Sequence, residues 1–282
     1  MENRTIQELF SRKSVRVFSD EKITEEEKRL ILEAAIQAPT AGNMSLFSIL
    51  DIQSQEIKDV LAKRCDNQNF IAEAPVVLVF LADYQRWCDV LESYEMTIPP
   101  MGEGDLFLAM QDCIIAAQNA VVASESMGIG SCYIGDILEN YEDNQKLLNL
   151  PKYVLPVSML VLGRPTKQQK NRTKPERFKV EDIVFTDTYP DKDTEETREA
   201  FKRKLNVGDA ELKQRLERYS KRKFAIPASV TQIDDGGNGI FAAYPKAQEL
   251  FGVFEYKVIL QVKRGSVAHR YAAKKKIRFE LV

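Results

Sequence analysis

The order of polar and apolar positions near the N-terminus predicts an amphipathic helix. Thr24-Glu25-Glu26-Glu27 has the Ser/Thr-x-x-Glu spacing of a capping box, in which a side chain at each end of the first turn satisfies a free backbone N–H. Apolar residues then follow at positions 30, 31, 34, 35 and 38, which share one helical face, and Pro39 stops the pattern. The helix is therefore expected to begin at Thr24 and to end before Pro39.

Three short apolar runs predict strands. Residues 46–52 form one run, and 75–81 (PVVLVFL) is continuous and β-branched, as in a strand covered on both faces. Residues 154–162 predict a second core strand. The third run stops at Gly163-Arg164-Pro165. We expect 75–81 and 154–162 to lie centrally in one sheet.

Residues 105–127 predict a long helix that is apolar on nearly every side and that ends at Gly128. Two interpretations remain open: a core helix within one subunit, or a core helix that also packs against a second subunit. The following residues, 128–136 (GIGSCYIGD), predict a turn, a short strand and a second turn. Asp136 is expected to cap a helix that runs to about Leu150.

The rest of the chain is less regular. Residues 164–194 are polar, contain prolines and lack periodicity, so they predict an extended excursion over the surface. Helical periodicity returns over 197–223.

Composition excludes several classes of protein. Among 282 residues, 40 Lys and Arg against 42 Asp and Glu give a net charge of −2, without the basic excess of a nucleic-acid binder. The apolar runs at 74–82 and 156–162 are shorter than the roughly 20 residues that span a bilayer. The first residues show no signal peptide, so we expect a cytoplasmic protein with no membrane or nucleic-acid partner.

A single histidine, His269, argues against nucleophilic sites that need an imidazole base and against most transition-metal sites. The four cysteines, Cys65, Cys88, Cys113 and Cys132, form no C-x-x-C pair. We therefore expect buried free thiols and no metal.

Basic side chains and turns occur in a combination that suits a phosphate-bearing cofactor. Ser11-Arg12-Lys13-Ser14-Val15-Arg16 places cations and hydroxyls together, and Lys174-Pro175-Glu176-Arg177 adds a second basic pair. Turns at 40–43 (TAGN) and 133–136 (YIGD) would present backbone N–H groups. The alternative for either basic run alone is a solvated surface. Because no G-x-G-x-x-G motif is present, a Rossmann dinucleotide site is not predicted.

These motifs, in this order, resemble the FMN-dependent nitroreductase and flavin reductase family. The similarity includes RKSVRVFSDEKI (12–23), APTAGN (38–43), Gln68 before Ala74-Pro75, the GIGSCYIGD turn and KPERF (174–178), and it covers roughly residues 4–223. The chain looks most similar to the NADPH-linked, oxygen-insensitive nitroreductases and FMN reductases.

The resemblance implies a set of cofactor-binding residues. Arg12, Lys13 and Ser14 would hold the FMN phosphate with Lys174 and Arg177, and Arg16 would lie by the ribityl chain and the N1/C2 edge of the flavin. Gln68 would contact the pyrimidine edge, the Gly135 N–H would face N5, and Tyr133 and Ile134 would shape that face. Thr40, Gly42 and Asn43 would approach the ring system, in a turn that departs from the commoner serine-rich version. The complete predicted set is Arg12, Lys13, Ser14, Arg16, Thr40, Gly42, Asn43, Gln68, Tyr133, Ile134, Gly135, Lys174 and Arg177.

The resemblance also implies an α+β fold, a mixed central sheet wrapped by helices, and a homodimer with FMN at its interface. The implied activity is ping-pong transfer of hydride from NADPH or NADH through FMN to nitroaromatics, quinones, free flavins or another small planar acceptor. No side chain would act as catalyst, because the chemistry belongs to the flavin. The alternative is a flavin-binding redox sensor or FMN carrier without turnover. Arg218 and the basic run 221–223 are candidates for the 2′-phosphate of NADPH, or simply a solvated helix end.

The last 58 or so residues differ in character from the rest. Residues 225–282 hold nine Lys and Arg against five Asp and Glu, whereas 1–224 hold 31 against 37. We expect a catalytic domain at 1–224 and an atypical segment at 225–282. That segment is either a native extension with a strand at 254–262, or a tail translated out of frame. With suitable codons, a one-base shift at Gln232 gives the helix-like peptide KSMTEAMEYLQRIQKHKNYLEYLNIK and then a stop codon.

Overall fold

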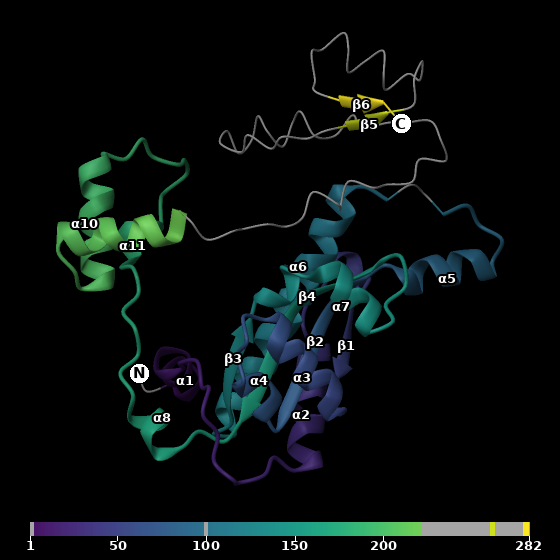
Figure 1. The fold of residues 1–282 in the computed structure, drawn as a ribbon, viewed down its shortest axis with the longest axis horizontal. Coiled ribbons are helices and arrows are strands. Elements are labelled where there is room, and N and C mark those ends of the chain that lie inside the picture. Colours follow the sequence, from purple (N-terminus) through teal and green to yellow (C-terminus); the bar gives the residue numbers. More distant parts are fainter. Residues whose placement is uncertain (1–2, 99–100, 221–259, 263–278, 282) are drawn as a thin grey trace. The chain divides into compact units, whose positions relative to one another are not determined.

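The computed structural model describes residues 3–98, 101–220, 260–262 and 279–281 (Figure 1). The chain divides into two compact units, Met1–Phe224 and Ala225–Val282. In the first unit the elements are α1 (Arg4–Ser11), α2 (Glu25–Ile36), η1 (Ala41–Asn43), β1 (Phe47–Asp51), α3 (Gln55–Arg64), α4 (Phe70–Glu73), β2 (Val76–Asp83), α5 (Gln85–Ser93), α6 (Glu103–Ser126), β3 (Gly130–Ile134), η2 (Asp136–Leu138), α7 (Tyr141–Leu147), β4 (Val154–Gly163), α8 (Lys167–Asn171), α9 (Val180–Ile183), α10 (Thr194–Leu205) and α11 (Asp209–Ser220).

The central sheet has four strands in the order β1-β2-β4-β3, and each neighbouring pair is antiparallel. The predicted central strands are confirmed, because β2 and β4 occupy the two middle positions. The sheet was expected to be mixed, yet its four strands pair only antiparallel; the parallel pairing beside them is a single bridge between Ser14 and Ser131 of β3.

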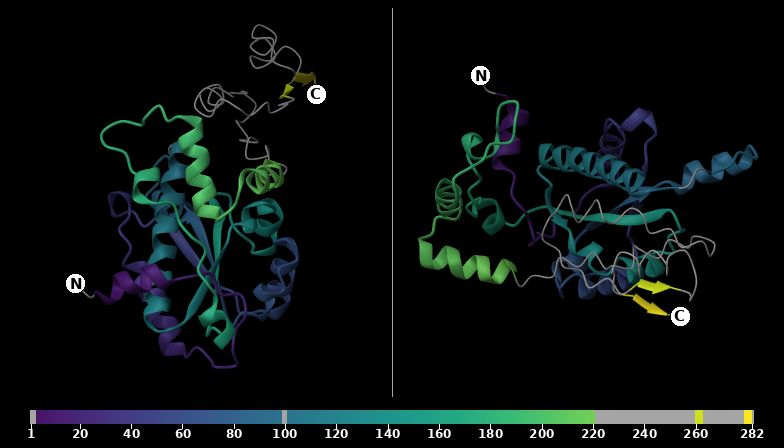
Figure 2. Two further views of the ribbon diagram at one scale, coloured as in Figure 1. Left: turned by 90° about the vertical axis from the view of Figure 1, so that its left-hand side faces the viewer. Right: turned by 90° about the horizontal axis from the view of Figure 1, so that it is seen from above.

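Helices cover both faces of this sheet (Figures 1 and 2). Helices α2 and α6 pack on one face, where alternate residues of β2 such as Leu78 and Phe80 point. Helices α3, α4 and α7 pack on the other face, which receives Val77 and Val79. Since side chains alternate along a strand, a continuous apolar run such as 76–82 fills both cores at once. The α+β architecture agrees with the prediction.

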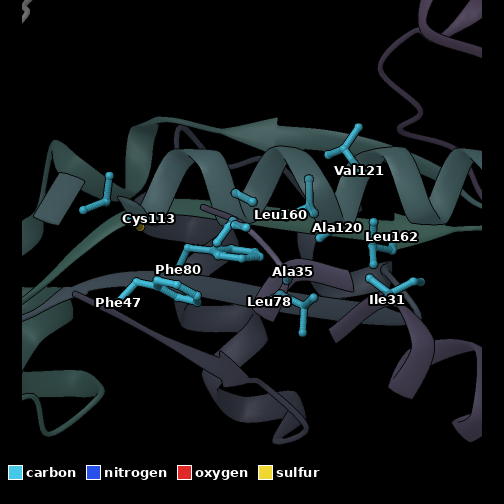
Figure 3. Close-up of a cluster of buried hydrophobic side chains, with 14 of the residues drawn as sticks. Ile31, Ala35, Phe47, Leu78, Phe80, Cys113, Ala120, Val121, Leu160 and Leu162 are labelled. Carbon is cyan, nitrogen blue, oxygen red and sulfur yellow. The ribbon is translucent and has the colours of Figure 1, made fainter. Parts of the chain in front are cut away.

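Helix α2 follows its predicted capping box. The Thr24 hydroxyl accepts the Glu27 N–H at 3.1 Å and the Glu27 carboxylate accepts the Thr24 N–H at 2.9 Å, so both free donors are satisfied. Figure 3 shows Ile31 and Ala35 of α2 beside Phe80 and Leu162 of the sheet.

Helix α6 is buried on one side only. Small residues, Ala116, Ala117 and Ala120, let it lie close to the sheet, whereas Phe107 is 60% exposed and Ile114 is 44% exposed. By length and composition, residues Gly104–Ser126 could also cross a membrane, a possibility that the shorter apolar runs had not suggested. In this structure the helix covers the sheet, as the core helix of a globular domain does.

Two helix predictions need correction. Asp136 does not cap a helix to Leu150: its segment is the single turn η2, and α7 begins only at Tyr141. The 197–223 pattern is two helices, α10 and α11, because Asn206 adopts a left-handed conformation with φ of 52° that ends α10.

The other predictions for the outer segments agree with the structure where it describes them. Residues 164–193 are largely irregular and contain the short helices α8 and α9, and α10 begins at Thr194. All four cysteines are free and buried. In the second unit the described strands β5 (Leu260–Val262) and β6 (Phe279–Leu281) pair in parallel, and the predicted strand at 254–262 otherwise lies outside the described residues.

The segment between α1 and α2, residues 12–20, lies very close to the sheet. A Cβ atom added at Gly130 would meet Val15 Cγ2 at 2.4 Å, and one added at Gly163 would meet Phe18 Cδ1 at 2.3 Å. Both distances are far below van der Waals contact. These two glycines therefore make room for Val15 and Phe18, and we call residues 12–18 the docked segment.

We predict that Gly130→Ala destabilises the protein by about 1–3 kcal/mol, because the added methyl group overpacks a buried contact. Urea denaturation followed by circular dichroism measures the loss. Gly104→Ala is the matched control, since nothing lies within 4 Å of the position where its Cβ would be. Equal stability of the two variants would contradict the tight docking of Val15.

Candidate functional site

The docked segment runs beside β3 at the edge of the sheet. The Val15 N–H donates to the Ser131 carbonyl at 2.9 Å, and farther along the Ser19 N–H donates to the Arg164 carbonyl at 2.8 Å. Arg12 therefore lies near β3, with its Cζ 5.8 Å from the centre of the Tyr133 ring. This edge of the sheet therefore brings the predicted residues near Arg12 together with Tyr133.

A second segment, residues 169–174, joins the docked segment through its cations. Lys13 Nζ donates to the carbonyls of Lys170 and Arg172 at 2.5 and 2.6 Å, and Lys174 Nζ donates to the Phe10 carbonyl at 2.5 Å. The Arg172 guanidinium donates to the Ser14 carbonyl at 2.6 Å. Arg172 was not predicted, although it lies in the same basic stretch as Lys174.

Positive charge gathers here without a matching number of anions. Arg12 Nε and Nη2 are buried and have no hydrogen-bond partner among the described residues. The pKa of Lys174 is lowered, first by burial and then by the positive charges of Arg177 and Arg12. Buried donors without acceptors are costly, so the site suits a bound anion.

Two acidic side chains, Glu8 and Glu125, line a hollow beside Arg12. Glu125 of α6 lies with Glu8, Leu9 and Arg12 around this small hollow between α1 and α6. The pKa of Glu125 is raised, chiefly by burial, although the charge of Arg12 opposes the shift. Sequence reasoning missed Glu125; the signal was an acidic residue within an otherwise apolar helix.

Beside the basic cluster, β3 presents its residues to opposite faces. Tyr133 is half-buried on the α6 side, where its hydroxyl lies 3.3 Å from Gln118 Oε1, and burial raises its pKa to about 12. The Ile134 side chain is buried in the other core, so only its backbone remains to shape the same surface as Tyr133. Gly135 follows and is exposed.

The next part of the site is built around Gln68. Its Nε2 donates to the Cys65 carbonyl at 2.9 Å and to Asp136 Oδ2 at 2.6 Å, which ties it to the turn after β3. Two residues on, the Phe70 ring lies 5.8 Å from Cζ of Arg16. Arg16 and Gln68 are thus brought to the same edge of the sheet as Gly135.

Three carboxylates lie close together beside Gln68. Oxygen atoms of Asp66, Asp136 and Glu139 are within 4.8 Å of one another. Acidic groups at a surface often gather without an ion, so we assign no metal to them.

The 40–43 turn lies away from β3, at the opposite edge of the sheet. Asp112 of α6, itself buried, accepts the N–H groups of Ala41 and Leu46 at 3.0 and 3.1 Å, and the Thr40 hydroxyl accepts the Ser45 N–H at 3.2 Å. The turn leads into β1, which is the edge strand opposite β3. Within the described chain, no hydrogen bond joins Thr40, Gly42 or Asn43 to the cluster at β3. Asp112 was not predicted.

Among the described residues, the hydrogen bonds of Arg177 are local. The Arg177 guanidinium donates to the Pro175 carbonyl at 2.7 Å and lies near enough to Lys174 to affect its pKa. Arg218 lies in the last turn of α11, and residues 221–223 lie outside the described residues.

Known proteins are similar to this chain in sequence and in fold. A sequence model described as the nitroreductase family matches residues 9–164, more than half of the chain. An FMN reductase (NAD(P)H) of Bacillus subtilis is 33% identical over 194 residues, which cover 68% of this chain and 76% of that protein.

Solved structures agree. Nitroreductase A from Vibrio parahaemolyticus has a TM-score of 0.71 and 26% identity, with 79% of this chain and 93% of that chain covered. NADPH:FMN oxidoreductase from Vibrio harveyi, solved in complex with NAD⁺, has a TM-score of 0.70 and 25% identity, with 81% and 95% covered.

The raised pKa of Glu125 predicts a pH-dependent stability. The folded protein holds the proton of the Glu125 carboxyl group more tightly than the unfolded chain does. The stability that this proton adds to the folded state is therefore complete below the unfolded pKa and is lost as the pH rises through the folded pKa. Glu125→Gln keeps a neutral side chain at every pH. In cofactor-free protein, we expect the free energy of unfolding of this variant, relative to wild type, to increase from about pH 4 to pH 7.

Denaturant titrations at the two pH values measure this difference, and Glu92→Gln at an exposed site of α5 is the control. A relative stability that stays constant with pH, or that falls, would contradict a destabilising buried charge.

Proposed function

Because this chain belongs to the nitroreductase family, we propose that it is an FMN-dependent oxidoreductase that takes electrons from NAD(P)H and passes them to a small planar acceptor. Nitroaromatics, quinones and free flavins are the acceptors of this class that we expect. The observation that carries the proposal is Arg12, whose buried Nε and Nη2 atoms have no hydrogen-bond partner among the described residues and whose charge helps to lower the pKa of Lys174.

The phosphate of FMN fits this cationic cluster. Arg12 supplies free donors, the Ser14 hydroxyl lies two residues on, and Lys13, Lys174 and Arg177 add positive charge nearby. Lys13 and Lys174 hold backbone carbonyls of facing segments, so they also fix the two segments that would enclose the phosphate.

We propose that the isoalloxazine lies near Arg16, Gln68 and Tyr133. Bound FMN supplies hydride acceptance at N5 and two-electron transfer to the acceptor. Arg16 would stabilise negative charge at the N1/C2 edge, because its guanidinium is exposed and not paired with a carboxylate in the described residues. Gly135 would direct its backbone N–H toward N5, and as an exposed glycine it adds no side chain over that atom.

No side chain needs to act as a nucleophile in this scheme. We propose a ping-pong order, in which NAD(P)H gives up its hydride and leaves as NAD(P)⁺ before the acceptor enters the same site. This order needs only one open face of the flavin. Because the flavin would carry the chemistry, a chain with a single histidine can still be an enzyme. All four thiols are buried, and burial raises the pKa of Cys65 to about 12.

We also propose that two copies of the chain assemble to complete the site. The 40–43 turn leads into the edge strand β1, whereas Arg12 and Tyr133 lie at β3, the opposite edge of the sheet. The turn of one chain would therefore approach the flavin held by the other chain. An apolar surface is available for the contact: Phe107, Ile114 and Ile115 of α6 are exposed along one side of the helix.

The catalytic domain that we propose is residues 1–224, acting in the cytoplasm. We assign no residue of 225–282 to the proposed site, and we hold that segment to be either a native extension or an out-of-frame tail. Sequencing the source DNA distinguishes these, because only a frameshift requires codons for the alternative peptide in the shifted frame.

Anaerobic titration tests the function. Purified protein with bound FMN should lose its flavin absorbance on addition of about one equivalent of NADPH or NADH, and should recover it quickly when a nitroaromatic or quinone is added. Bleaching without recovery would favour a redox sensor. A colourless protein that takes up no FMN would contradict both interpretations.

Arg12→Ala tests the phosphate site. We expect the dissociation constant for FMN to rise by about 10- to 100-fold, as for loss of a charge-assisted hydrogen bond, while riboflavin, which lacks the phosphate, binds both proteins alike. Flavin fluorescence titration measures both. Arg29→Ala, an exposed arginine of α2, is the control. Equal losses for FMN and riboflavin would place the phosphate elsewhere.

A further inference from the structure

The Gln68 side-chain amide is held in one orientation by two acceptors. Its Nε2 donates to the Cys65 carbonyl at 2.9 Å and to Asp136 Oδ2 at 2.6 Å. An amide nitrogen carries two hydrogens, so both are used. Turning the amide over would place Oε1 against a carbonyl and a carboxylate, which are acceptors only, and would cost both hydrogen bonds.

The backbone beneath this amide is also fixed. The Gln68 N–H donates to the Ala62 carbonyl at 3.0 Å, and the two residues before it, Asp66 and Asn67, have left-handed φ values of 58° and 52°. The tight turn after α3 thus fixes the position of the Gln68 backbone, and the two acceptors fix the orientation of its amide group.

The other end of the amide remains available. No described residue donates to Gln68 Oε1, and the residue is only half-buried. Two residues along the chain, the Phe70 ring contacts the Arg16 guanidinium. This edge of the site therefore offers a hydrogen-bond acceptor from Gln68 and donors from Arg16.

We propose that Asp136 is a positioning residue that makes Gln68 present its carbonyl oxygen to the ligand, so that the site selects a flavin whose N3 atom carries a hydrogen. The inference rests on the proposed function and deepens it. The pyrimidine edge of a flavin has an N3–H donor, and Oε1 of Gln68 is the matching acceptor.

A carboxylate is well suited to this task. Cys65 provides a single carbonyl and holds only one of the two Nε2 hydrogens, so without Asp136 the amide has one anchor and can turn. A charged acceptor shortens and strengthens the second bond, in keeping with its 2.6 Å length. The same carboxylate comes directly after Gly135, so the orientation of Gln68 is linked to the turn that would face N5 in the proposed site.

The test compares FMN with FMN methylated at N3, which lacks the donor. In wild-type protein, methylation is expected to raise the dissociation constant about tenfold or more, as for loss of one hydrogen bond and contact with an added methyl group. In Asp136→Leu, FMN binding is expected to weaken while methylated FMN binds as before, so that the two constants come within about threefold. Asp136→Asn should restore the wild-type ratio, because its Oδ1 can accept the same Nε2 hydrogen.

Three results would overturn the proposal. Equal weakening of both flavins by Asp136→Leu would show a merely structural role. An Asp136→Asn protein that behaves like the leucine variant would show that charge, rather than amide orientation, matters. Unchanged discrimination in Asp136→Leu would show that Asp136 does not act on Gln68. If the wild-type protein binds neither flavin, the proposed function fails instead.

Discussion

The site depends on the docking of residues 12–18 against the edge strand β3. A backbone hydrogen bond from Val15 to Ser131 sets the register, and Gly130 and Gly163 allow Val15 and Phe18 to come closer than any other residue would permit. Because the side chains alternate along this segment, burying Val15 leaves its neighbours Ser14 and Arg16 free of the core. One packing constraint thus sets the position of a whole group of polar residues.

The electrostatics of the site follow from this placement. The docked segment brings the buried guanidinium of Arg12 close to Lys174, whose pKa is lowered by burial and by neighbouring positive charge. Glu8 and Glu125 line the adjoining hollow, and burial raises the pKa of Glu125. A protein that only needed a stable fold would gain by replacing such a cluster with apolar residues. Such an unfavourable cluster of buried charges is expected where a bound ligand supplies the missing negative charge. A phosphate group has the charge and geometry to do so.

The sequence allowed much of the fold to be predicted, because local signals were strong. The capping box at Thr24 is set by neighbouring residues, and the mainly apolar strands at 76–83 and 154–163 are set by burial on both faces. Asp136 misled the helix prediction since its carboxylate binds Gln68, a partner distant in sequence, instead of a helix N-terminus. Such tertiary hydrogen bonds leave no periodic trace. The same holds for Asp112, which ties the 40–46 turn to α6, and for Arg172, which holds the Ser14 carbonyl.

Family resemblance supplied candidate site residues from the sequence, but the sequence could not show that these candidates divide into two groups. The strand order places the 40–43 turn and β3 at opposite edges of one sheet, and that separation is a property of the fold. A crystal structure of the protein with FMN tests this account most directly. The account predicts the phosphate within hydrogen-bonding distance of the Arg12 guanidinium, and the 40–43 turn of a second copy against the flavin ring. A phosphate bound away from Arg12, or a flavin contacted by the 40–43 turn of the same chain, would contradict it.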